Sequence, residues 1–106
     1  MPKFLITASY TADGAKGLLK EGGSARRAVV QKLVDGIGGK LEAFYFALGH
    51  QDAFVVVDVP DSASVVAISL AVNASGAVRI STTPLLSPED LDAASKKSLG
   101  YRPPGA

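Results

Sequence analysis

The sequence predicts an α+β domain in which helices cover one face of a four-stranded antiparallel sheet. Two observations support this prediction. Segments with the period-two apolar pattern of strands alternate with segments of helical period in the order β-α-β-β-α-β, and a capped helix follows at the end. Two strongly apolar runs separated by only four polar residues also predict a central hairpin, which places two consecutive strands side by side.

The first half of the chain predicts a strand, a loop and a helix. In Lys3–Tyr10, apolar and polar residues alternate as expected for a strand. The segment Thr11–Gly23 contains four glycines and is expected to be a loop with one helical turn around Ala15–Lys20. Ser24 is the predicted N-cap of a helix that begins at Ala25. The apolar residues of this helix follow the helical spacing and form one buried stripe, namely Val30, Leu33, Val34 and Ile37. Glycines then end the helix.

The central hairpin is predicted to be apolar on both faces. Its strands are Leu41–Leu48 and Ala53–Val59, joined by Gly49–Asp52. Pairing Leu48 with Ala53 divides the side chains between two faces. One face carries Phe44, Phe46, Val55 and Val57, and the other carries Ala43, Tyr45, Ala47, Phe54 and Val56, with Asp58 as its charged residue.

The second half predicts another helix, a strand and a terminal helix. Asp61 is the expected N-cap of a helix that runs to Asn73, and Gly76 suits the left-handed residue after it. Ala77–Thr83 is predicted to be the fourth strand, interrupted by Pro84. The C-terminal helix begins with a capping serine, a proline at its first position and acids in its first turn, and residues 99–106 form an extended tail. This order is the ferredoxin-like split βαβ arrangement, and residues 1–106 are expected to form a single domain.

Composition narrows the classes of function. The formal net charge is +1, from 11 basic and 10 acidic residues, which gives no electrostatic reason to expect nucleic acid or a membrane surface as a partner. No apolar run has the length needed to cross a bilayer, and Met1–Ile6 is expected to begin a strand rather than a signal peptide. The chain contains no cysteine, which excludes disulfides, thiolate catalysis and cysteine-based metal sites. A cytoplasmic protein is the simplest expectation.

The doubly apolar hairpin predicts self-association. Helices on one side of the sheet bury only one of its faces, so the other requires a partner, and a second copy of the chain is the predicted partner. The alternative is that the C-terminal helix folds back over the exposed face within one chain.

The most prominent candidate functional residues lie in the hairpin turn. His50 is the only histidine, and Asp52 is two residues away, as in a base with its orienting carboxylate or a pair of metal ligands. Turns are also polar simply because they are solvated. With one histidine and no cysteine, neither a metal nor another cofactor is predicted. Tyr10, Tyr45 and Arg79 are further candidates to line a small cavity with these two residues.

A second candidate site lies at the start of the first helix. Gly23 and Ser24 expose backbone N–H groups to an anion if they begin the helix, and Arg26 and Arg27 are close in sequence. The alternative is a capped helix start without a ligand.

Several segments resemble the small bacterial GYD-domain proteins. The resemblance rests on Lys3–Thr11, Gly22–Arg27, Gly38–Tyr45, Gly49–Asp52 and Ala74–Arg79 with Thr82-Thr83. It covers essentially the whole chain and implies a ferredoxin-like fold of the dimeric α+β barrel type, in a family whose function is mostly unknown. The family is named for a glycine, a tyrosine and an aspartate near the turn. Gly49 and Asp52 match, whereas Gln51 replaces the expected tyrosine, which argues against an active site at the turn.

Two hypotheses of function follow. In the first, a homo-oligomeric barrel protein binds a small organic ligand in a pocket between sheet and helices, and the five candidate residues of the hairpin and strands line this pocket. Cofactor-free enzymes use related barrels, but the sequence identifies no reaction. In the second, the protein is a structural or interaction module that self-associates through its apolar sheet face and has no catalytic site. A cavity of about 300 Å3 or more favours the first hypothesis, and a filled interior favours the second.

Overall fold

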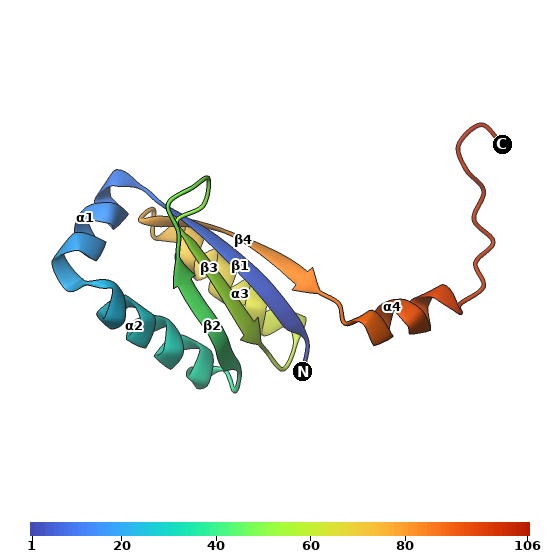
Figure 1. Cartoon of the computed structure of the whole chain (residues 1–106), viewed down its shortest axis with the longest axis horizontal. Coiled ribbons are helices and arrows are strands. Elements are labelled where there is room, and N and C mark those ends of the chain that lie inside the picture. Colours follow the sequence, from blue (N-terminus) through green and yellow to red (C-terminus); the bar gives the residue numbers. More distant parts are fainter.

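The computed structural model describes residues 1–106 and contains four strands and four helices (Figure 1). The elements follow in the order β1 (Lys3–Tyr10), α1 (Ala12–Glu21), α2 (Gly23–Gly36), β2 (Lys40–Phe46), β3 (Ala53–Asp58), α3 (Ser62–Ala74), β4 (Val78–Leu85) and α4 (Pro88–Ser95). All neighbouring strands are antiparallel, and the strand order is β2-β3-β1-β4. The predicted α+β, ferredoxin-like architecture is confirmed.

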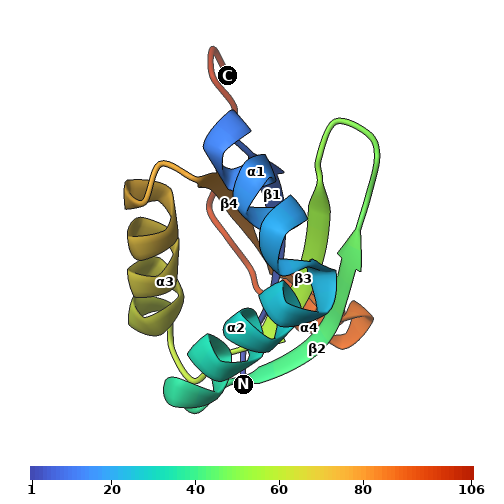
Figure 2. The same ribbon diagram turned by 90° about the vertical axis from the view of Figure 1, so that its left-hand side faces the viewer.

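The hydrophobic core lies between one face of the sheet and the helices α2 and α3. It joins Phe4 and Ile6 of β1 to Val55 and Val57 of β3, together with one valine from each helix. In the register, Phe4 is opposite Val57 and Ile6 is opposite Val55, so these side chains share a face. Helix α2 packs over β2 and helix α3 packs over β4, at opposite margins of the sheet (Figure 2).

The segment predicted to be a loop is instead the helix α1. Thr11 caps it, because its hydroxyl accepts a hydrogen bond from the Gly14 N–H at 3.2 Å. The glycines inside this segment suggested a loop, but the capping hydroxyl and the contact of α1 with α2 outweigh their low helix propensity. Helix α2 also begins earlier than predicted, at Gly23 rather than Ala25. Its N-cap is Gly22, with φ at +88°, and Ser24 lies inside the helix.

The hairpin has the predicted faces but a longer loop. Strand β2 ends at Phe46, which is opposite Ala53, and not at Leu48. The register is therefore displaced by two residues, which leaves the side chains of residues 43–46 and 53–58 on their predicted faces because the strand period is two. A β-bulge lies between Leu41 and Ala43.

Helix α3 follows the prediction and attaches to the outer edge of the sheet. Asp61 caps its start, and Gly76 after its end has φ at +75°. The Asn73 side chain accepts a hydrogen bond from the Ile80 N–H at 2.7 Å and donates one to the Ile80 carbonyl at 3.4 Å. Contrary to expectation, β4 continues through Pro84. The Pro84 nitrogen and the Ile80 nitrogen point to the same, outer side of β4. No strand lies on that side, so the missing N–H of Pro84 breaks no hydrogen bond of the sheet.

The Asp61 cap predicts a specific response to acid. The Ser64 N–H donates to the Asp61 carboxylate at 2.8 Å, and this bond lowers the pKa of Asp61 below its ordinary value. A lowered folded-state pKa stabilises the protein above the ordinary pKa of about 4, and this contribution is lost as the pH falls through the folded-state value. Asp61→Asn keeps a capping oxygen that does not titrate. We expect the variant to lose less stability than wild type between about pH 5 and pH 2 in urea unfolding, whereas equal losses would contradict this role.

The C-terminal residues leave the body of the protein. Ser87 caps α4 as predicted, and with Asp90 it forms a capping box in which each side chain bonds the backbone of the other residue. Helix α4 makes no extensive contact with another element, and every residue from Leu86 to Ala106 is exposed (Figure 1). The sequence-based alternative in which this helix covers its own sheet is therefore not observed. None of the four helices combines the length and hydrophobicity that a membrane crossing requires.

Candidate functional site

Asp52 ties the hairpin loop to the end of β1. Its carboxylate accepts a hydrogen bond from the Tyr10 N–H at 2.8 Å, and its own N–H donates to the Ala8 carbonyl at 2.7 Å. The Asp52 carbonyl in turn accepts from the Ala47 N–H at 2.8 Å. Three bonds thus use the Asp52 backbone and carboxylate to close the loop, which gives the residue a structural role.

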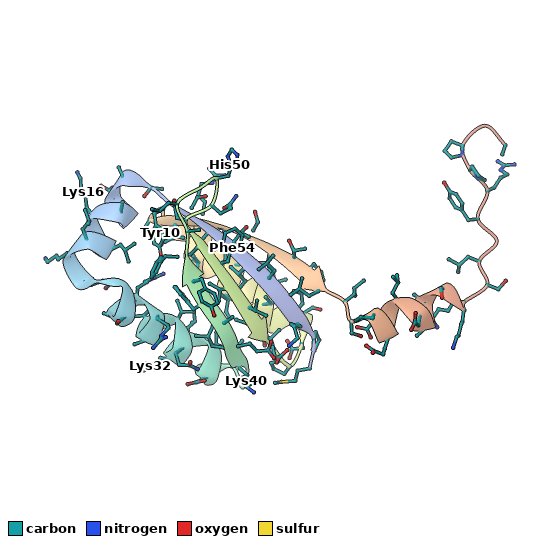
Figure 3. All side chains as sticks on the ribbon, viewed as in Figure 1. Tyr10, Lys16, Lys32, Lys40, His50 and Phe54 are labelled. Atoms are coloured by element: carbon teal, nitrogen blue, oxygen red, sulfur yellow. The ribbon has the colours of Figure 1, made fainter.

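The other predicted ligand-binding residues point to different parts of the molecule. His50 lies at the exposed tip of the hairpin loop, whereas Tyr10 lies beside α1 (Figure 3). Tyr45 of β2 is 71% exposed on the sheet face that no helix covers, and Arg79 is exposed on β4. No hydrogen bond joins His50 to Asp52. The structure therefore does not assemble Tyr10, Tyr45, His50, Asp52 and Arg79 around one cavity.

The predicted anion-binding residues are also divided. Ser24 and Arg27 lie along a groove between α2 and β2 that is also lined by Glu42, whose carboxylate bonds Lys3. Arg26 instead borders the core cavity and the groove between α1, α2 and α3. Gly23 is packed closely, because a Cβ at this residue would lie 2.9 Å from the Phe46 ring. Anion binding by Gly23, Ser24, Arg26 and Arg27 stays a prediction.

The cavity between the sheet and the helices is small and apolar. Its volume is about 70 Å3, and Arg26 is the one charged residue among those that line it. Of the five predicted ligand-binding residues, only Tyr10 reaches it. Ligand sites for drug-sized molecules usually have volumes of about 300–1,000 Å3, so this cavity is too small for such a ligand.

The uncovered face of the sheet, called here the open face, has an apolar half and a polar half. The apolar half lies on β2, β3 and the start of β1 and comprises Leu5, Ala43, Tyr45, Phe54 and Val56. Phe54 is opposite Tyr45 in the register and is 40% exposed, near the middle of this face (Figure 3). The polar half lies along β1 and β4 and comprises Thr7, Ser9, Arg79, Ser81 and Thr83. A contiguous exposed apolar surface of this kind usually marks an interaction site.

Two polar features were not predicted from the sequence. One is an open groove of about 650 Å3 at the hairpin end of the polar half, where Ser9 and Arg79 are opposite each other and the Ser9 hydroxyl donates to Gln51 at 3.0 Å. The other is a charged cluster at the far end of the open face, where Lys3 bonds Glu42 and also pairs with Asp58 at 3.2 Å. Bonding to Glu42 and to Asp58 raises the pKa of Lys3. Both features join residues that are distant in the sequence, so only the strand register could have revealed them.

Comparisons with known proteins place this chain in a family. The model of the GYD domain matches residues 4–94. A protein of Thermus thermophilus, named "Glutamine synthetase and cystathionine beta-lyase binding protein", is 32% identical over 93 residues, which cover 88% of this chain and 97% of that protein. No solved structure gives a significant match. The resemblance inferred from the sequence is confirmed, and the chain belongs to the GYD-domain family.

Proposed function

We propose that this protein is a homo-oligomeric interaction module of the cytoplasm that self-associates through its open face and binds an enzyme. The observation that carries the proposal is the exposed apolar half of the open face, with Tyr45 and Phe54 opposite each other, above a core whose cavity is only about 70 Å3. A core cavity too small for a drug-sized ligand, together with an exposed apolar face, favours association over ligand binding inside the core.

The Thermus thermophilus relative supports an enzyme as the partner. That protein is named for binding glutamine synthetase and cystathionine beta-lyase. By analogy, we propose that the present chain binds a glutamine synthetase or a cystathionine beta-lyase of its own organism. Two copies joined by their open faces leave the helical surfaces free, and exposed Leu19 and Val29 on α1 and α2 make that side the proposed enzyme-binding surface.

Small-ligand binding is a second candidate function, at the polar groove rather than in the core. Arg79 provides a guanidinium there, and Ser9 and Ser81 provide hydroxyls, which suits an anionic ligand. The groove is open to solvent, so a ligand would be held by these polar contacts and not by enclosure.

Replacing Phe54 with Asp is expected to separate the subunits without unfolding them. The substitution removes an aromatic side chain from the proposed interface, and the new carboxylate must lose its water when two copies associate. We therefore expect self-association to weaken by roughly 30-fold or more. Native mass spectrometry of the freshly purified protein measures the subunit number and any retained ligand together. Leu19→Asp is the matched control, because Leu19 is 88% exposed on α1, outside the open face.

The same measurements discriminate between the two candidate functions. A monomeric wild-type protein, or equal effects of the two substitutions on subunit number, would contradict self-association through the open face. An organic ligand retained by wild type and lost in Arg79→Ala would favour the second candidate. Addition of purified glutamine synthetase and cystathionine beta-lyase tests the partner directly, and absence of binding to both at micromolar concentration would contradict the proposed enzyme partner.

A further inference from the structure

The C-terminal segment Leu86–Ala106, called here the arm, extends away from the rest of the molecule. It continues beyond the end of β4 and carries α4 outward from the sheet (Figure 1). The radius of gyration is 16.9 Å and the longest dimension is 56 Å. A compact chain of this length has a radius of gyration of about 13 Å, so the arm makes the monomer much more extended than a globular domain.

The composition of the arm is unsuited to permanent exposure. Four large apolar residues lie along it with 63–81% of their surface exposed, namely Leu86, Leu91, Leu99 and Tyr101. Helix α4 has only eight residues, whereas an isolated helix shorter than about 12–15 residues is marginal in water. The capping box stabilises its first turn but buries no apolar surface. The arm therefore needs a surface on which to pack.

The open face offers a surface that matches the arm in two respects. Its apolar half presents Tyr45 and Phe54 to solvent, as the arm presents its leucines. The charge of α4 is also opposite in sign to that of the open face, which carries Lys3, Lys40 and Arg79 against Glu42 and Asp58, whereas the rest of the arm carries Lys96, Lys97 and Arg102. Helix α4 has no basic residue and carries three acids, namely Glu89, Asp90 and Asp92. Lys40 and Arg79 lie on strands of the open face and form no ion pair within the chain.

We propose that the arm of one copy packs against the open face of a second copy, and that the second copy returns the same contact. The direction of the arm supports exchange between copies, because only Leu86 and Ser87 connect β4 to α4 and the arm points away from its own sheet (Figure 1). A twofold arrangement makes both contacts equivalent and closes the assembly at two subunits. This inference rests on the proposed self-association and adds that each copy completes the interface of the other.

Cross-linking between singly substituted chains tests the exchange. The chain has no cysteine, so Leu91→Cys in the arm and Phe54→Cys on the open face each introduce a unique thiol. The two proteins are mixed, allowed to exchange subunits and treated with a short bismaleimide, and intact mass identifies the mixed dimer. Glu89→Cys is the matched control, because two residues correspond to a rotation of about 200° and place Glu89 on the opposite side of α4 from Leu91.

We expect the mixture of Leu91→Cys with Phe54→Cys to give at least fivefold more mixed dimer than the mixture of Glu89→Cys with Phe54→Cys. Equal yields would overturn the exchange. In the doubly substituted chain at low concentration, a cross-link within one monomer would also overturn it, since the arm would then cover its own sheet.

Native mass spectrometry of the same untreated proteins separates this inference from the proposed function. Dimers without the Leu91–Phe54 cross-link would overturn arm exchange and leave self-association intact. Monomers in all samples, wild type included, would overturn both.

Discussion

Val57→Asp is expected to unfold the protein at 25 °C. Val57 has no exposed surface and lies on β3 between Phe4 of β1 and Leu41 of β2. A carboxylate there has neither water nor a cation beside it, so it destabilises the folded state by several kcal/mol even if it becomes protonated. Domains of this size are stable by only about 5–15 kcal/mol. Circular dichroism and backbone amide NMR spectra would report the loss of fold.

Val56→Asp is the matched control for this prediction. Val56 is the adjacent residue but faces the opposite side of the sheet, where it is partly exposed in one chain. We expect this variant to keep the dispersed NMR spectrum of a folded protein while its association weakens. If both variants unfold, the open face contributes to the stability of the monomer, and its separate role in association would be contradicted.

Gly14→Ala is expected to destabilise the protein by about 2–4 kcal/mol, against the direction that helix propensity predicts. Gly14 lies in the first turn of α1, and a Cβ at this residue would lie 1.9 Å from the Ala77 carbonyl oxygen. That oxygen also accepts hydrogen bonds from the Thr11 N–H at 3.0 Å and from the Thr11 hydroxyl at 3.1 Å. The methyl group must therefore push α1 away from the start of β4 and weaken both bonds.

Gly17→Ala in the same helix should have the opposite effect. Apart from the neighbouring residues and the backbone of α1 itself, no atom lies within 4 Å of a Cβ at Gly17, so the change only removes backbone entropy from the unfolded chain and stabilises α1 by about 0.5–1 kcal/mol. Urea unfolding of the two variants and wild type checks the pair. Stabilisation by Gly14→Ala would show that α1 does not pack against Ala77 as the structure describes.

The fold was largely predictable because local patterns and strand periodicity determine it. The two faces of the hairpin were correct despite a register displaced by two residues, since Phe44 and Val55 keep the same side in either register. Helix α1 was missed because Gly14 and Gly17 resemble loop residues. The requirement for glycine at residue 14 comes from Ala77, which is 63 positions away, and no local pattern contains that information.

The candidate site was less predictable because it depends on where side chains meet. His50 and Asp52 are close in sequence, yet one is exposed at the loop tip while the other bonds the Tyr10 backbone. The apolar open face was predictable, since it follows from alternation alone. The outward course of the arm was not, because the capping box of α4 specifies where the helix begins but not what it packs against.

The attachment of Asn73 to Ile80 limits how copies of this protein can join. Edge strands normally present free N–H and C=O groups on which another strand can grow. On β4, the Asn73 side chain occupies both backbone groups of Ile80, and Pro84 has no N–H to offer. On β2, the bulge next to Leu41 interrupts the ladder. These features disfavour growth of one continuous sheet from molecule to molecule, while the broad apolar face stays available for a finite assembly.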